Sequence, residues 1–156
     1  MMVNYFQLLG LDESYRLDLN VLENAYIELQ QQFHPDRLVG KATEERANAI
    51  QTSMDVNEGY EQLKSPLGRA EHLLALQGII VNTDEHDTHK PSQALLMEMM
   101  QLREQLSGAQ SEIDIAKYSQ DIRAAMKQCE KTLADLFDAE SYEEAAQQVI
   151  RLRYLG

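Results

Sequence analysis

Apolar residues at helical spacing mark the first long helix of the chain. They lie 3, 4, 3 and 4 residues apart, which places them on one face of a helix of about four turns. These residues are Leu19, Leu22, Tyr26, Leu29 and Phe33. Asp18 is placed to cap this helix, and Pro35 ends it because proline disfavours helical geometry in the preceding residue. A shorter helix is expected at 3–9, closed by Gly10.

The next helix is expected to begin near Thr43, because Glu44 and Glu45 in its first turn oppose the positive end of the helix dipole. The pattern assigns four residues to its buried side: Ala47, Ile50, Met54 and Leu63. Ser65 and Pro66 then pair an N-cap with a proline at the first helical position. This pair predicts a new helix that runs to Gly78.

Residues 79–91 have no helical period and carry turn-forming residues, so we interpret them as a linker. Three helices are expected after it, at about 92–107, 111–137 and 141–154. Their predicted caps are Ser92 for the first helix and two capping boxes, Ser111 with Asp114 and Ser141 with Glu144. Three antiparallel helices with short loops make a bundle. The sequence therefore predicts an all-α chain of two modules.

The first helix of this bundle carries two apolar stripes. Its core stripe would consist of Leu95, Met99, Leu102 and Leu106. Leu96, Met97 and Met100 lie well off that stripe, at about 100° per residue. An exposed apolar patch with flexible methionines is typical of a protein-binding surface. The alternative is that these residues pack against the N-terminal module or against another helix.

Charge and composition narrow the choice of partners. The 156 residues have a formal net charge of −12. An acidic chain repels phosphate backbones and anionic membrane surfaces, so we expect neither nucleic acid nor a membrane as partner. Solubility is the simplest explanation of the acidity. No run of about 18 apolar residues predicts a membrane span, and the first residues lack the layout of a targeting peptide. We expect a cytoplasmic location.

The titratable sulfur and imidazole groups give little sign of a metal or cofactor. The single cysteine, Cys129, excludes an internal disulfide and a multi-cysteine metal site, and it shares the apolar stripe of its helix. We therefore expect it to be a buried structural thiol. The spacing of His86 and His89 can clamp a metal on a helix, but in a turn-rich stretch we interpret both as solvated. We expect no metal and no cofactor.

Candidate chemistry concentrates in the turn formed by His34, Pro35 and Asp36. A rigid proline turn presents an imidazole and a carboxylate side by side at an exposed helix junction. No nucleophile accompanies them and no Gly-rich phosphate loop exists, so the chain is not expected to be an enzyme. Taken alone, the turn is most simply an ordinary helix-breaking loop.

The surroundings of this turn resemble the J domain, in which a Tyr-containing first helix, an apolar second helix, a His-Pro-Asp loop and a third helix follow in this order. Residues 3–64 match that order. The next segment is similar to the HscB-type co-chaperones, whose pattern appears here as Asn57, Tyr60, Leu63, Pro66, Arg69, Ala70, Glu71, Leu73 and Leu74. Segments 96–98, 102–104 and 152–155 extend the resemblance over essentially the whole chain.

The resemblance implies a J domain at 1–75, built as an antiparallel helical hairpin with short flanking helices. A linker at 76–91 and a three-helix bundle at 92–156 follow. It further implies two binding functions in iron–sulfur cluster assembly. The J domain docks on a specialised seventy-kilodalton heat-shock-type ATPase (the HscA type) and stimulates it. The bundle binds the cluster scaffold protein (the IscU type) and delivers it to that chaperone.

The resemblance also assigns residues to each partner. The chaperone contacts are His34, Pro35, Asp36 and Arg37. The scaffold contacts are Leu96, Met97, Met100, Gln101, Glu104 and Tyr154.

Several residues depart from the family pattern. J domains usually present Lys or Arg on the second helix, but residues 19–33 contain none. Arg37 stands where lysine is commoner, Gln101 replaces an acidic residue and Gly108 occupies another such position. Separately, the alternative to the cluster-assembly function is a J-domain adaptor that serves a general chaperone and an unrelated client.

Overall fold

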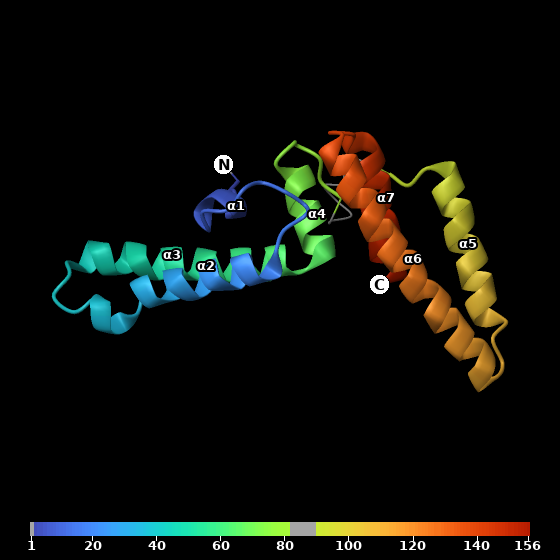
Figure 1. Cartoon of the computed structure of the whole chain (residues 1–156), viewed down its shortest axis with the longest axis horizontal. Coiled ribbons are helices and arrows are strands. Elements are labelled where there is room, and N and C mark those ends of the chain that lie inside the picture. The colour runs from blue at the N-terminus through green and yellow to red at the C-terminus, as the bar shows by residue number, and fades with distance from the viewer. Residues whose placement is uncertain (1, 82–89) are drawn as a thin grey trace. The chain divides into compact units, whose positions relative to one another are not determined.

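The computed structural model describes residues 2–81 and 90–156, and all regular structure within these ranges is helical (Figure 1). The all-α prediction is confirmed. The chain divides into two compact units, Met1–Leu76 and Gln77–Gly156. Among the described residues no helix combines the length and the apolar character that a membrane crossing requires.

The first unit is built on a helical hairpin. Its elements are α1 (Tyr5–Leu8), α2 (Leu19–Gln32), the 3-10 turn η1 (Pro35–Arg37), α3 (Thr43–Lys64) and α4 (Pro66–Ala75). Figure 1 shows α2 and α3 side by side and antiparallel, with η1 at the distal end. Two predicted caps are confirmed: the Asp18 carboxylate accepts from the Asn20 amide at 2.8 Å, and the Ser65 hydroxyl accepts from the Gly68 amide at 3.2 Å.

The core of this unit lies where α1 and α4 meet the proximal half of the hairpin. Phe6, Leu22, Leu63 and Leu74 are almost completely buried there. The close approach of α1 to α3 depends on Gly59, because a Cβ at this position would lie 2.8 Å from Cδ1 of Tyr5. The distal half of the hairpin, which carries η1, is therefore stabilised by the contacts between α2 and α3.

Those distal contacts are largely polar, and this overturns one prediction. The side-chain oxygen Oδ1 of Asn57 accepts hydrogen bonds from the Tyr26 hydroxyl and from the side-chain amide of Gln30, each at 2.8 Å. The Ser53 hydroxyl donates to the side-chain oxygen of Gln30 at 3.1 Å. Beside this polar seam, three apolar side chains of α3 lie in solvent, whereas Val56 is buried. The prediction that Ala47, Ile50 and Met54 are buried is wrong, whereas Leu63 is fully buried.

The second unit contains α5 (Gln93–Ser107), α6 (Glu112–Asp138) and α7 (Tyr142–Leu155). Its core forms where α7 packs on the C-terminal half of α6, and it includes Cys129, Leu133, Val149 and Leu152. Ile79 and Val81, which precede α5 in this unit, are buried as well. The prediction of a buried thiol at Cys129 is confirmed. His86 and His89 lie outside the described residues.

The helix starts of this unit follow the sequence with one exception. The Ser92 hydroxyl accepts from the Leu95 amide, and the Ser111 hydroxyl accepts from the Asp114 amide, each at 3.1 Å. Ser141 makes no such bond, so the predicted capping box at the start of α7 is wrong. Its ψ of 72° differs from the extended values of 162° and 161° at Ser92 and Ser111, so its backbone does not have the geometry of those two caps.

The end of α5 and the start of α6 lie outside the core. Leu106 is 50% exposed, so the prediction that it belongs to the core stripe of α5 is wrong, and Ile115 on the first turn of α6 is 51% exposed as well. The cause is a mismatch in length, since α6 has 27 residues and α7 has only 14. The first turns of α6 extend past the end of α7 and have no third helix against them.

Candidate functional site

The His-Pro-Asp turn is built as a single turn of 3-10 helix that His34 caps. The His34 backbone is extended, and its ring nitrogen Nδ1 accepts a hydrogen bond from the Asp36 amide at 3.2 Å. The Asp36 carboxylate Oδ2 lies 3.5 Å from the same nitrogen. Pro35 occupies the first position of the turn, where its fixed φ fits and its missing N–H is not needed. The imidazole and the carboxylate are therefore held beside one another.

Both side chains of this turn are open to solvent. The His34 side chain is 59% exposed and the Asp36 side chain is 90% exposed. In a neutral ring whose Nδ1 accepts a hydrogen bond, the proton is on Nε2. Within the described ranges no hydroxyl or thiol hydrogen-bonds to this ring, so the turn lacks an activated nucleophile. Its geometry suits recognition by another protein.

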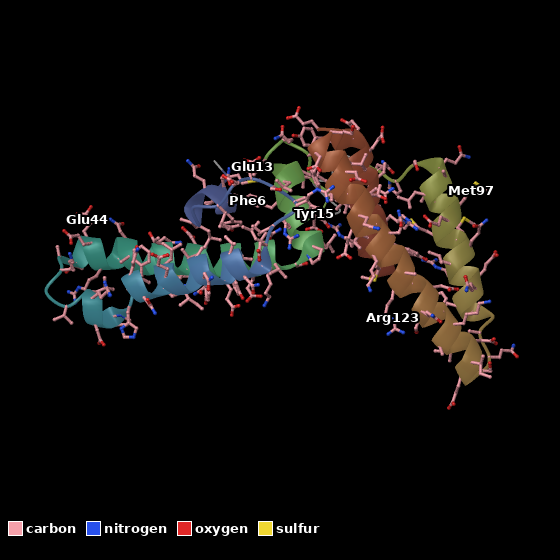
Figure 2. All side chains as sticks on the ribbon, in the orientation of Figure 1. Phe6, Glu13, Tyr15, Glu44, Met97 and Arg123 are labelled. Atoms are coloured by element: carbon pink, nitrogen blue, oxygen red, sulfur yellow. The ribbon has the colours of Figure 1, made fainter. Side chains whose placement is uncertain are left out.

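A second exposed surface lies on α5 in the other unit. Leu96, Met97 and Met100 are 46%, 57% and 65% exposed, and Gln101 and Glu104 beside them are exposed as well. Figure 2 shows Met97 on the side of α5 that faces away from α6. The prediction of an exposed apolar stripe is confirmed, and these side chains are not packed against another helix of their own unit. We call these five residues the α5 patch.

Tyr154 does not belong to the open part of this patch, because its hydroxyl has a partner within the unit. It donates to the Met99 backbone carbonyl at 2.7 Å, and the side chain is half-buried. The ring thereby reaches α5 at the residue next to Met100. The structure thus brings Tyr154 to the helix that carries the patch, where it fastens α7 to α5.

Tyr154 is one of three polar residues on α7 that hold α5 in place. The Gln147 amide accepts from the Ser92 backbone N–H at 2.7 Å and donates to the Lys90 carbonyl at 2.8 Å. One helical turn later, Arg151 pairs with Glu98 at 3.0 Å from both Nε and Nη2. We call Gln147, Arg151 and Tyr154 the α7 ladder.

The polar contacts of the α7 ladder hold α5 in place where its apolar contact with the rest of the unit is small. Leu95 is the single residue of α5 that is buried. The hydrogen bond that Arg151 donates to the Glu98 carboxylate raises the pKa of Arg151 above its usual value, against the opposing effect of burial. Sequence reasoning did not identify Gln147, Arg151 or Glu98 as site residues. Their signal was the spacing of 4 and 3 between polar positions on α7, which marks one helical face.

Comparisons with known proteins agree with these features. Residues 91–156 match the model of the HSCB C-terminal oligomerisation domain. A co-chaperone protein HscB from Proteus mirabilis (strain HI4320) is 34% identical over 158 residues, which cover 99% of this chain and 90% of that protein.

Two solved structures have the same fold over nearly the whole chain. The human co-chaperone protein HscB aligns with a TM-score of 0.85 at 28% identity and covers 99% of this chain and 77% of its own. The chaperone HscB from Vibrio cholerae aligns with a TM-score of 0.79 at 32% identity and covers 98% of this chain and 91% of its own.

These findings define a class first and then a family. A J-like N-terminal domain followed by a C-terminal helical bundle is the architecture of co-chaperones of the HscB kind. Within that class, the chain belongs to the HscB family of co-chaperones. The family resemblance seen in the sequence is confirmed.

Proposed function

We propose that this protein acts in the cytoplasm as an adaptor of iron–sulfur cluster assembly. In this function it binds an IscU-type scaffold protein and delivers it to an HscA-type chaperone, whose ATPase it stimulates. The unit that carries the His-Pro-Asp turn contacts the chaperone, and the unit that carries the α5 patch contacts the scaffold. Iron and sulfur are the cargo of the scaffold and are not held by this chain.

The observation that carries the proposal is the presence of two exposed recognition surfaces, one in each compact unit. An exposed apolar patch of this kind is uncommon on a chain without a partner, and methionines adapt readily to a protein surface. The exposed ring and carboxylate of the turn are oriented by one another and not by a substrate pocket. Each surface therefore suits a protein partner.

The chain acts on the chaperone by preferring one of its conformational states. A ligand shifts an equilibrium only by its difference in affinity for the two states. His34, Pro35, Asp36 and Arg37 are the proposed chaperone contacts. Leu96, Met97, Met100, Gln101, Glu104 and Tyr154 are the proposed scaffold contacts, with Tyr154 on α7 acting through its hydrogen bond to α5.

Steady-state ATP hydrolysis by the organism's HscA-type chaperone tests the proposal. The chaperone is measured alone, with this protein, and with this protein and the scaffold. We expect stimulation by the protein and a further increase with the scaffold. His34→Gln should abolish both effects, and Leu96→Ser with Met100→Ser should abolish only the second. All three residues are exposed, so circular dichroism should show unchanged folding.

The alternative adaptor function gives a different pattern. Stimulation of a general chaperone, with no response of the HscA type and no effect of the scaffold, would favour a J-domain adaptor for another client. A protein that stimulates neither chaperone would overturn the proposal altogether.

A further inference from the structure

An apolar groove of about 560 Å³ lies beside the His-Pro-Asp turn, at the distal end of the hairpin. His34 and Pro35 form part of its wall. The apolar side chains that line the rest are Phe33, Leu38, Val39, Ile50 and Met54. The groove is thus continuous with the turn that we propose as the chaperone contact.

The lining of this groove is unusually open for apolar side chains. Val39 is 82% exposed, Ile50 57% and Met54 54%. Ile50 and Met54 are four residues apart and share one face of α3, next to the polar seam that joins α3 to α2. No other part of the described chain covers them. Their burial is left to a partner.

Cations gather around the same end of the hairpin. Arg37, Lys41 and Arg46 are three of the six Lys and Arg residues in 1–76, and within the described residues none of their side chains has an ion pair or hydrogen bond. Arg46 lines the groove itself. Asp36, Glu44 and Glu45 balance these charges, so the distal end is neutral overall while the rest of the unit is acidic. This end is therefore where an acidic partner meets the least repulsion.

The usual area of a protein interface implies that a partner bound to the turn also covers neighbouring surface such as the groove. A specific interface covers about 800 Å² on each partner, which far exceeds three residues of a turn. A protein that contacts His34 and Asp36 must extend over neighbouring surface. The α2 surface offers no Lys or Arg between 19 and 33, whereas the groove offers apolar side chains bordered by unpaired cations.

We infer that this groove is a second docking element for the chaperone ATPase, which inserts an apolar segment flanked by carboxylates. The inference rests on the proposed function and deepens it. In this arrangement the turn supplies activation, and the groove supplies affinity that other J domains draw from basic residues on the second helix. The two elements are therefore separable by kinetics.

The test measures ATP hydrolysis by the HscA-type chaperone over a range of concentrations of the full-length protein. Ile50→Ser with Met54→Ser should raise the concentration for half-maximal stimulation at least tenfold, the loss expected when apolar side chains no longer gain burial. Maximal stimulation should remain within about twofold of the wild type. His34→Gln should instead lower the maximum.

The matched control is Leu19→Ser with Ile27→Ser, two side chains of α2 that are 50% and 46% exposed and line no groove at the distal end. Val39→Ser provides an independent variant in a loop, where loss of folding is not at issue. It should raise the half-maximal concentration about threefold.

A second arm tests the charges. Lys41→Gln with Arg46→Gln should raise the half-maximal concentration about threefold and weaken its dependence on salt, compared with Lys127→Gln and Lys131→Gln on α6. Groove variants that match their controls, beside a wild type that stimulates the chaperone, would overturn the inference and leave the proposed function intact. A wild type without stimulation would overturn both.

Discussion

His72 is a buried histidine whose structural role the sequence pattern does not indicate. It is 5% exposed, and its Nε2 accepts a hydrogen bond from the Tyr5 amide at 3.0 Å. The ring lies against Tyr5 and Phe6, with centroids 4.8 and 5.8 Å away. Burial lowers the pKa of His72, and the nearby Glu13 opposes this only in part. The neutral imidazole is therefore a structural acceptor that joins α4 to α1.

This histidine should make the first unit sensitive to mild acid. An unfolded histidine titrates near pH 6.5, whereas the folded ring has a lower pKa. As the pH falls, the unfolded state therefore takes up a proton on His72 before the folded state does. The stability that neutral His72 contributes is fully present above about pH 6.5 and is lost as the pH falls below that value. Urea unfolding between about pH 7.5 and 5.5 should show the loss, at most about 1.4 kcal/mol per pH unit for one proton.

The control for this prediction is His72→Gln, whose amide oxygen can still accept from Tyr5 but does not titrate. The variant should be less stable than the wild type at pH 7.5 and should have a flatter pH dependence. Equal slopes for the two proteins would show that His72 is not the group responsible.

At this scale, the sequence predicted residues whose role is set by their neighbours in the chain. His34, Pro35 and Asp36 form a turn because Pro35 ends the helix before it, and Cys129 follows the apolar stripe of its own helix. The role of His72 was not predictable. Its hydrogen-bond partner is 67 residues away, and the spacing of α4 gives no sign of it.

At the scale of elements, the attachment of α5 determines how the α5 patch is presented. Because α5 buries one side chain, its position depends on the α7 ladder more than on apolar packing. Within the α7 ladder, the hydroxyl of Tyr154 makes the hydrogen bond that lies nearest to Met100. Its hydrogen bond to a backbone carbonyl fixes the helix without occupying a side chain of the patch.

Tyr154→Phe should weaken scaffold binding although it leaves the aromatic ring in place. Loss of one hydrogen bond costs about 1 kcal/mol, so the dissociation constant should rise about fivefold, as calorimetry can measure. Amide exchange in α5 should become faster at the same time. Tyr118→Phe is the control, since that hydroxyl makes no hydrogen bond among the described residues. Unchanged affinity in Tyr154→Phe would mean that the ring itself is the contact.

The spacing of apolar residues along the sequence is sufficient to predict the helices, but it fails to predict which of their side chains are buried. It predicted the helices and most of their starts, because caps and apolar spacing are local properties. It failed for Ile50, Met54 and Leu106, because exposure depends on what lies opposite. A polar seam between α2 and α3, and the shortness of α7 beside α6, are properties of pairs of helices.

At the scale of the whole molecule, the proposed function requires that one chain carry both surfaces. The scaffold reaches the chaperone because it is bound to the same molecule that contacts the ATPase, which raises its effective concentration there. Two compact units on one chain meet this requirement. The two surfaces should therefore fail to complement each other when they are placed on different molecules.

A mixture of two variants tests this requirement with the folded chain. One variant carries His34→Gln and keeps the α5 patch, and the other carries Leu96→Ser with Met100→Ser and keeps the turn. The second variant alone should stimulate the chaperone to the level seen without scaffold. Adding the first should give no scaffold-dependent increase, and an excess of it should suppress the increase produced by the wild type, because it retains the scaffold without activating the ATPase. A mixture that recovers the full response would contradict action by a single chain. It would indicate instead that two copies work together.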